Sequence, residues 1–160
     1  MIKSFRPKKR LGQNLLINTR VQQRIARACE LQAHDIILEI GPGKGAITKL
    51  IAPQVKHIYA IEKDPQLVAY LRHQLIATNV SILHADFLTF SWARLKKPIK
   101  VIGNIPYNIS TPILEKLIEK RAHISAFYLM VQKEYAKRLS AKARSKDYGS
   151  LSCFVQYYGA

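Results

Sequence analysis

The 160-residue sequence has few acidic residues, with 10 Asp and Glu against 26 Lys and Arg and a formal net charge of +16 at pH 7. No acidic residue precedes Glu30. Net charge does not decide the fold, but this excess indicates a polyanionic partner, with nucleic acid first and an anionic membrane second. A basic surface that only aids solubility is the alternative explanation.

Cysteine and long apolar runs are also scarce. Cys29 and Cys153 are the two cysteines and lie far apart, which predicts a reducing cytoplasm and no disulfide framework. They form no metal-binding spacing with the five histidines, so we expect no metal. No apolar run approaches the length of a membrane span, and the basic N-terminus lacks the apolar stretch of a secretion signal. We therefore expect a cytoplasmic monomer that does not associate with membranes.

Apolar runs alternate with amphipathic segments along most of the chain. We expect strands at 35–40, 57–62, 80–85, 99–103, 124–132 and 150–158, and helices at 19–31, 45–52, 65–77, 111–120 and 133–143. Strands that are apolar throughout and alternate with helices indicate a parallel sheet covered on both faces. Right-handed crossovers make this a doubly wound α/β sheet, which binds ligands beyond the carboxyl ends of its strands.

A glycine-rich turn follows the first expected strand. Gly41-x-Gly43-x-x-Ala46 satisfies the loose dinucleotide pattern, and Glu62 lies about 20 residues further on, where a ribose-binding acid belongs. A carboxylate that binds ribose hydroxyls serves NAD and S-adenosylmethionine equally, so an NAD-dependent oxidoreductase stays open at this point. We interpret Lys44 as a solvated surface residue, because the sequence contains no phosphate-loop motif.

Acidic residues also end the first strand and follow the third, at Glu39 and Asp86. Asp86 can accept a hydrogen bond from an adenine amino group, with Phe87 supplying the next backbone N–H. A helix N-cap is the alternative role for Asp86. Together with Glu62, these acids predict one polar pocket at the carboxyl edge of the sheet.

The segment G-N-I-P-Y-N-I-S at 103–110 follows the fourth strand. Pro106 fixes its own φ and pushes Ile105 toward an extended conformation, so the loop is stiff. Asn104 adds a neutral acceptor and Tyr107 a flat ring. This set suits a planar heterocycle that bears an amino group. Acceptors out of the ring plane would free the amine's lone pair and stabilise the positive charge that develops during attack on a methyl sulfonium.

Six segments resemble successive motifs of the ribosomal RNA adenine dimethyltransferases. They are LGQNLL (11–16), ILEIGPGKGAIT (37–48), AIEKD (60–64), HADFL (84–88), GNIPYNIS (103–110) and MVQKEYAKRL (130–139). The resemblance implies a Rossmann-like fold of the S-adenosylmethionine-dependent methyltransferase type and dimethylation of adenine N6. One branch of that family modifies small-subunit ribosomal RNA and assists ribosome assembly; the other modifies large-subunit RNA and confers macrolide resistance. MVQKEYAKRL followed by DYGSLSCFVQYY resembles the small-subunit branch, which we favour.

The resemblance also implies roles for individual residues. Those expected to hold S-adenosylmethionine are Gln13, Asn14, Leu16, Gly41, Gly43, Gly45, Glu62, Asp86, Phe87 and Asn104. Those expected to form the catalytic site and hold the target adenine are Asn104, Ile105, Pro106 and Tyr107. From charge and helical spacing, we expect RNA phosphates at Lys8, Lys9, Arg10, Arg20, Arg24 and Arg27.

The sequence departs from the family pattern in two places. Leu15 stands where the family usually has phenylalanine. The family also continues beyond this chain with a final strand, an F-x-P-x-P motif and a helical RNA-binding domain. We therefore expect a basic arm with a cofactor motif at 1–17, a methyltransferase domain at 18–160 and no C-terminal helical domain. Such a chain would bind cofactor but methylate poorly, or act only as an RNA-binding or assembly fragment, with 150–158 as an aggregation-prone sheet edge.

Overall fold

The computed structural model describes residues 16–76, 79–93, 95 and 98–159. The strands are β1 (Ile36–Ile40), β2 (His57–Glu62), β3 (Val80–His84), β4 (Ile99–Asn104) and β5 (Ile124–Met130). The α-helices are α1 (Thr19–Ala28), α2 (Ala46–Ile51), α3 (Pro65–Gln74), α4 (Ser110–Glu119), α5 (Lys133–Leu139) and α6 (Ser150–Tyr158). Short 3-10 helices are η2 (Ala52–Gln54), η3 (Tyr107–Ile109) and η4 (Arg121–His123). Among these described helices, none is long and apolar enough to cross a membrane.

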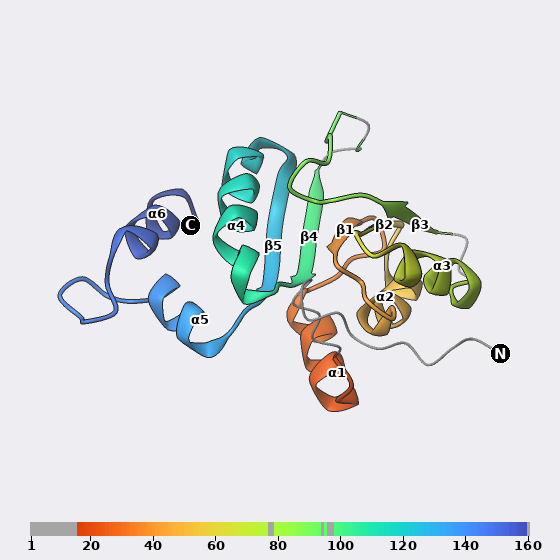
Figure 1. Ribbon diagram of the computed structural model, residues 1–160, viewed down its shortest axis with the longest axis horizontal. Coiled ribbons are helices and arrows are strands. Elements are labelled where there is room, and N and C mark those ends of the chain that lie inside the picture. The colour runs from red at the N-terminus through yellow and green to blue at the C-terminus, as the bar shows by residue number, and fades with distance from the viewer. Residues whose placement is uncertain (1–15, 77–78, 94, 96–97, 160) are drawn as a thin grey trace.

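The five strands form one parallel sheet in the order β3-β2-β1-β4-β5 (Figure 1). The chain moves outward from β1 through β2 to β3, and then returns to the other side of β1 as β4. Strand order therefore reverses between β1 and β4. In a doubly wound sheet, this reversal opens a crevice at the carboxyl ends of the two strands, which is where such folds bind ligands. The predicted α/β fold class is confirmed.

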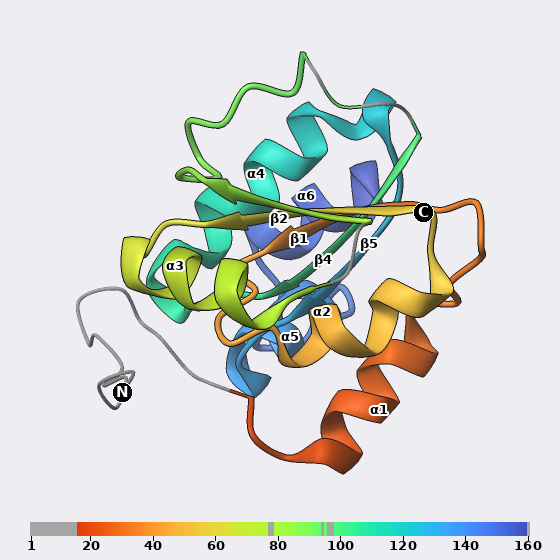
Figure 2. The same cartoon turned by 90° about the vertical axis from the view of Figure 1, so that its right-hand side faces the viewer.

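Alternate residues of each strand send side chains to opposite faces of the sheet. From β1, Leu38 and Ile40 enter a core cluster with Leu117 of α4, whereas Ile37 enters a second cluster with Ile51 of α2. Figure 2 shows α1, α2 and α3 on one side of the sheet and α4 on the other. The continuous apolar character of the strands follows from burial on both faces.

The segment 150–158 is a helix, and the prediction of a last strand there is wrong. Its aromatic and β-branched residues favour a strand by propensity, but Phe154 and Tyr158 are spaced for one helix face and lie 5.3 Å apart between ring centroids. Ser152, at the third helical position, accepts a hydrogen bond from the Gly149 N–H at 3.2 Å, which helps to fix the N-terminus of the helix. The aggregation-prone edge expected from this segment is therefore absent, because the segment does not join the sheet.

The other expected elements are confirmed with shifted ends. α1 begins where Asn18 caps it, since the Asn18 side chain accepts hydrogen bonds from the backbone N–H groups of Arg20 and Val21 at 3.0 and 3.2 Å. It stops at Ala28 rather than at residue 31. β4 runs one residue further than expected and includes Asn104, which brings that side chain to the last position of a central strand.

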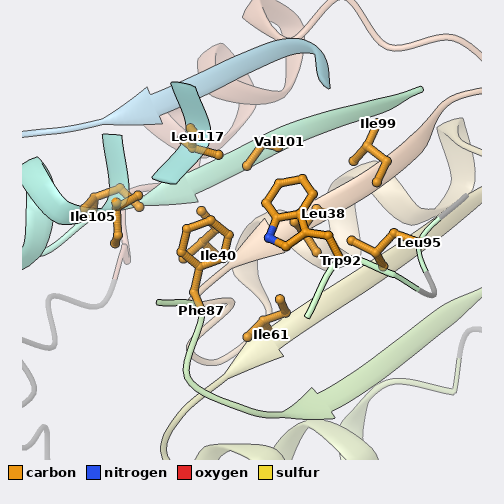
Figure 3. Packing of buried hydrophobic residues seen from close by; sticks show 11 residues of the cluster. Leu38, Ile40, Ile61, Phe87, Trp92, Leu95, Ile99, Val101, Ile105 and Leu117 are labelled. Atoms are coloured by element: carbon orange, nitrogen blue, oxygen red, sulfur yellow. The ribbon is translucent and has the colours of Figure 1, made fainter. Parts of the chain in front are cut away.

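Two side chains from the loops at the carboxyl edge reach into the core. Ile105 is 4% exposed and Phe87 is 5% exposed, and both belong to the cluster that Leu38 and Ile40 of β1 and Leu117 of α4 share. Figure 3 shows Ile105, Ile40 and Phe87 close together at one end of this cluster. The loops after β3 and β4 are thus attached to the core by apolar anchors.

Truncation of a buried side chain of α4 tests the packing of this helix against the sheet. Leu117 is fully buried, so Leu117→Ala removes apolar contacts and leaves a cavity, and we expect the free energy of unfolding to fall by about 2–5 kcal/mol. The matched control is Ile76→Ala, because Ile76 is 91% exposed and its truncation should change stability by less than about 0.5 kcal/mol. Urea unfolding followed by circular dichroism measures both; equal losses would contradict the assignment of α4 to the core.

Candidate active site

A cavity of about 120 Å³ lies at the carboxyl ends of β1, β4 and β5. Its wall includes Glu39 of β1, Gly41 of the glycine turn, Asn104 of β4, Met130 of β5 and Leu16 before α1. The cavity therefore occupies the crevice that the reversal of strand order creates. It brings together four of the predicted site positions, Leu16, Gly41, Gly43 and Asn104.

The glycine turn closes one side of this cavity. Gly41, Gly43 and Gly45 all have positive φ, at 64°, 60° and 74°. Around Gly41, a Cβ would meet no heavy atom within 4 Å, so the left-handed backbone there borders open space that a ligand can approach. Lys44, which we interpreted as a solvated surface residue, is half-buried and lines the cavity.

Glu62 is fixed at the end of β2 by two backbone groups. One carboxylate oxygen accepts a hydrogen bond from the Gly43 N–H at 3.2 Å, and the other accepts one from the Asp64 N–H at 2.9 Å. The residue is 6% exposed. Burial raises the pKa of Glu62 above its ordinary value, although the two N–H groups oppose that rise. These bonds orient the carboxylate, and each oxygen keeps a lone pair for a further donor.

Glu39 is a second buried acid at the cavity, and it was not among the residues singled out for the cofactor. It is 3% exposed, and its carboxylate accepts a hydrogen bond from the Thr48 hydroxyl at 2.6 Å. Burial raises the pKa of Glu39 to about 7, against the opposing hydrogen bonds from Thr48. An acid inside an otherwise apolar strand is the sequence signal that marks it, since such a charge is costly without a partner.

Asp86 and Phe87 follow β3 in different roles. The Asp86 carboxylate accepts a hydrogen bond from the Leu88 N–H at 3.0 Å and pairs with the Lys63 ammonium at 2.7 Å. The Lys63 hydrogen bond lowers the pKa of Asp86, more than the opposing effect of partial burial raises it. Phe87 places its ring in the core, and no described residue accepts a hydrogen bond from its backbone N–H. Asp86 caps a turn here and not a helix.

Pro106 of the Asn104–Tyr107 loop is held by hydrogen bonds from η3 and the start of α4. Pro106 has φ −61° and ψ 143°, and its carbonyl accepts hydrogen bonds from the Ser110 hydroxyl at 2.9 Å and from the Ile109 N–H at 3.2 Å. Tyr107 projects outward with 59% of its surface exposed. The Pro106 carbonyl thus has two donors, whereas no described residue donates a hydrogen bond to the Ile105 carbonyl.

Several predicted residues lie outside the described part of the chain: Gln13, Asn14, Lys8, Lys9 and Arg10. Their assigned roles stay predictions. Among the positions that the structure does describe, no group of three or more His, Cys, Asp or Glu side chains is arranged to hold a metal ion.

Arg20, Arg24 and Arg27 of α1 are all exposed, as expected for cations that meet a partner. Their distances from the cavity differ, because Ile17, just before α1, lines the cavity, whereas Glu30, just after it, accepts a hydrogen bond from Lys100 near the start of β4. α1 therefore runs from the carboxyl edge toward the amino edge. Arg20 lies nearest the site, and Arg27, seven residues later on the helix, lies about 10 Å further along its axis.

The sheet order defines a Rossmann-like α/β fold of the S-adenosylmethionine-dependent methyltransferase type. A dimethyladenosine transferase from Plasmodium falciparum has a similar structure, with a TM-score of 0.81 at 29% identity over 89% of this chain and 52% of that one. The 23S rRNA methyltransferase ErmE gives a TM-score of 0.71 at 32% identity over 85% of this chain and 53% of that one.

The chain belongs to the ribosomal RNA adenine dimethylase family, whose model matches residues 4–159. It is 39% identical to ribosomal RNA small subunit methyltransferase A of Alcanivorax borkumensis over 98% of this chain and 57% of that protein. The protein of the same name from Clostridium botulinum strain Langeland is 37% identical over 96% of this chain and 58% of its own length. The chain thus spans less than three fifths of these curated relatives.

The buried Glu39 should make stability depend on pH. Between its ordinary value of 4.5 and its folded pKa of about 7, the folded state keeps a proton that the unfolded chain releases. Raising the pH through this interval should therefore lower the free energy of unfolding, by on the order of 3 kcal/mol. Glu39→Gln keeps an acceptor for Thr48 but cannot ionise, so its stability should lack this component of the decline.

Urea unfolding at a series of pH values between about 4.5 and 8 measures the difference between the two proteins. The comparison isolates Glu39, because other titrating groups such as Glu62 are common to both. Parallel pH profiles for the wild type and Glu39→Gln would show that folding does not raise the pKa of Glu39.

Proposed function

We propose that this chain carries the S-adenosylmethionine-dependent dimethylation of adenosine N6 in small-subunit ribosomal RNA. The observation that supports the proposal most directly is the placement of Asn104 and Tyr107. They leave β4 at the rim of the crevice beside β1, with the cavity on one side and an exposed aromatic ring on the other.

The residues around the cavity fit the cofactor. Gly41 leaves room for a close approach of a ligand to the backbone, Glu62 offers oriented carboxylate oxygens to ribose hydroxyls, and Asp86 with the Phe87 N–H offers an acceptor and a donor to an adenine edge. When bound, S-adenosylmethionine supplies an electrophilic methyl group on a sulfonium centre. Glu39 and Leu16 line the cavity beside the glycine turn.

The Asn104–Tyr107 loop is suited to hold a flipped adenine. The Asn104 side-chain oxygen and the Ile105 carbonyl would accept hydrogen bonds from the two N–H groups of the N6 amine, while the base stacks on Tyr107. Acceptors in fixed positions stabilise the positive charge that grows on the nitrogen, with no reorganisation cost during the reaction. The methylated nitrogen then releases its proton readily to water, so the site needs no strong general base.

The small subunit is the preferred target because the two curated relatives compared above carry that name. ErmE, which is named as a 23S rRNA methyltransferase, supports large-subunit methylation as the second candidate. The excess of positive charge and the exposed arginines of α1 favour contact with RNA phosphates in either case. We also propose that the protein acts as a monomer in the cytoplasm.

Loss of the Glu62 carboxylate should weaken cofactor binding. We expect Glu62→Ala to lower the affinity for S-adenosylmethionine by about 100-fold or more, because charge-assisted hydrogen bonds to the ribose are lost. Glu115→Ala is the matched control, since Glu115 is an exposed acid on α4 and should leave the affinity unchanged. Isothermal titration calorimetry measures both. Tight binding by Glu62→Ala, or binding of NAD in place of S-adenosylmethionine by the wild type, would overturn the cofactor assignment.

Removal of the Tyr107 ring should slow methyl transfer without affecting cofactor binding. Stacking on one base is worth about 1–3 kcal/mol, so Tyr107→Ala should reduce the rate by roughly 10- to 100-fold. Tyr157→Ala is the control, because Tyr157 is an 81% exposed tyrosine on α6, away from the cavity. The assay follows labelled methyl groups from S-adenosylmethionine into unmodified small-subunit RNA, and the same assay with large-subunit RNA tests the second candidate. An unchanged rate in Tyr107→Ala would refute the stacking role.

A further inference from the structure

We propose that the exposed cations of α5 and the loop after it, residues 133–146, bind RNA phosphates beside the target adenosine. This segment, named here the α5 basic surface, was not among the RNA contacts expected from the sequence. The inference rests on the proposed function and adds a second phosphate-binding surface, on the opposite flank of the site from α1.

The α5 basic surface is strongly positive. It contains one acid, Glu134, and six exposed cations: Lys133, Lys137, Arg138, Lys142, Arg144 and Lys146. Within the described part of the chain, none of the six is in an ion pair. Cations that are exposed and not neutralised by neighbouring acids produce the potential that attracts a polyanion.

The sheet places this surface next to the candidate catalytic loop. β5 ends at Met130 alongside Asn104, and the Ile105 N–H donates a hydrogen bond to the Met130 carbonyl at 2.9 Å. α5 begins three residues later. A hydrogen bond of 3.0 Å joins the hydroxyls of Tyr135 and Thr111, which ties α5 to the start of α4 just after the loop. The short link from β5 to α5 and the Tyr135–Thr111 hydrogen bond therefore hold the α5 basic surface near Tyr107.

The loop after α5 is held in a defined shape. The Ser145 N–H donates a hydrogen bond to the Lys142 carbonyl at 3.1 Å, and the Gln156 side chain of α6 donates one to the Ala141 carbonyl at 2.8 Å. Arg144 lies inside the resulting turn with φ 70°, a conformation that favours glycine or asparagine. The left-handed backbone conformation at Arg144 costs about 1–2 kcal/mol relative to a right-handed one. Ordered cations lose less conformational freedom on binding than cations of a flexible tail.

The chemistry of the surface favours RNA over a membrane. A helix that lies on a membrane carries large apolar side chains beside its cations. Here the large apolar residues of the segment, Tyr135 and Leu139, are buried or half-buried. The exposed large apolar groups nearby are aromatic rings, Tyr107 beside the cavity and Tyr157 and Tyr158 on α6, and such rings suit stacking with bases. Cations for phosphates next to exposed aromatic rings for bases are the arrangement of a single-stranded RNA site.

The two basic surfaces flank the site from opposite directions. α1 begins at the cavity wall and lies with α2 on one face of the sheet. α5 follows β5, which is the edge strand beside β4 (Figures 1 and 2). An RNA strand that places a flipped base on Tyr107 would extend its backbone to both sides of that base. We infer that α5 takes the phosphates on the β5 side and that the first turn of α1 takes those on the β1 side.

The test compares three charge-neutralised proteins of equal net charge. The site variant combines Lys137→Gln, Lys142→Gln and Arg144→Asn, and asparagine suits the left-handed backbone at 144. The control variant combines Lys49→Gln, Lys56→Gln and Arg72→Gln, three exposed cations of α2, of the loop before β2 and of α3. A third variant, Arg20→Gln with Arg24→Gln and Arg27→Gln, reports on α1. All are made in the 160-residue chain.

The probe is an RNA hairpin with two adjacent unpaired adenosines in its loop, and its affinity is measured across a range of salt concentrations. For each phosphate that the protein no longer neutralises, the slope of log affinity against log salt should fall by about 0.7–0.9. We expect the site variant to lose about 2 from this slope and roughly 100-fold in affinity at 0.1 M salt, with the control unchanged. Calorimetry with S-adenosylmethionine should give the wild-type affinity for all variants.

Equal losses in the site and control variants would overturn the proposal, because they would reflect net charge alone. It would also fail if the site variant kept wild-type RNA affinity but lost binding to vesicles of an anionic lipid, which would make the surface a membrane contact. If the wild type binds cofactor and RNA while the site variant matches it, only this inference fails. If the wild type binds neither, the proposed function fails with it.

Discussion

The burial of Ile105 determines how the candidate site is presented. This side chain lies in the apolar core between β1 and α4, while its neighbours on each side, Asn104 and Pro106, are half-buried. An anchor of this size contributes about 1.5–3 kcal/mol when it is buried, enough to hold a short loop in one arrangement. Tyr107 follows Pro106, and its ring projects outward with 59% of its surface exposed. The positions of Asn104 and of the Tyr107 ring are therefore set by the packing of Ile105 beneath them and do not depend on contacts with a ligand.

Buried acids at the cavity give the site its electrostatic character. Glu39 and Glu62 lie at the ends of neighbouring strands in a protein whose surface is strongly positive. Each carboxylate is oriented by hydrogen bonds, Glu39 by Thr48 and Glu62 by backbone N–H groups, and burial raises the pKa of both. Acceptors held in a low-dielectric site interact more strongly with polar ligand groups than the same acceptors in water. The interior of the crevice thus suits a nucleoside, whereas the exterior suits phosphates.

Local sequence patterns predicted most of the helices and strands. Both faces of the sheet are covered, so its strands appear in the sequence as continuous apolar runs. Continuous apolar runs such as Ile36–Ile40 identify strands of a parallel sheet, and parallel strands impose the helical crossovers and the ligand edge. The segment 150–158 shows where this reasoning stops. Its residues have strand propensity, yet their spacing also fits a helix face, and a short apolar run does not distinguish the two. Contacts of the helix with α5 and with Arg121, which lies 5.1 Å from the Tyr158 ring, decide the outcome.

The sequence by itself determined the fold class, the acids and glycines at the strand ends and the stiffness of the Asn104–Tyr107 loop, because each follows from residue chemistry and short spacings. Only the tertiary structure decided that Lys44 lines the cavity, that Glu39 is paired with Thr48, that Arg20 lies closer to the site than Arg27, and that α5 stands beside Tyr107. These facts depend on the order of strands in the sheet and the direction of each helix across it. Strand order and helix direction arise from packing between distant segments, which no local pattern encodes.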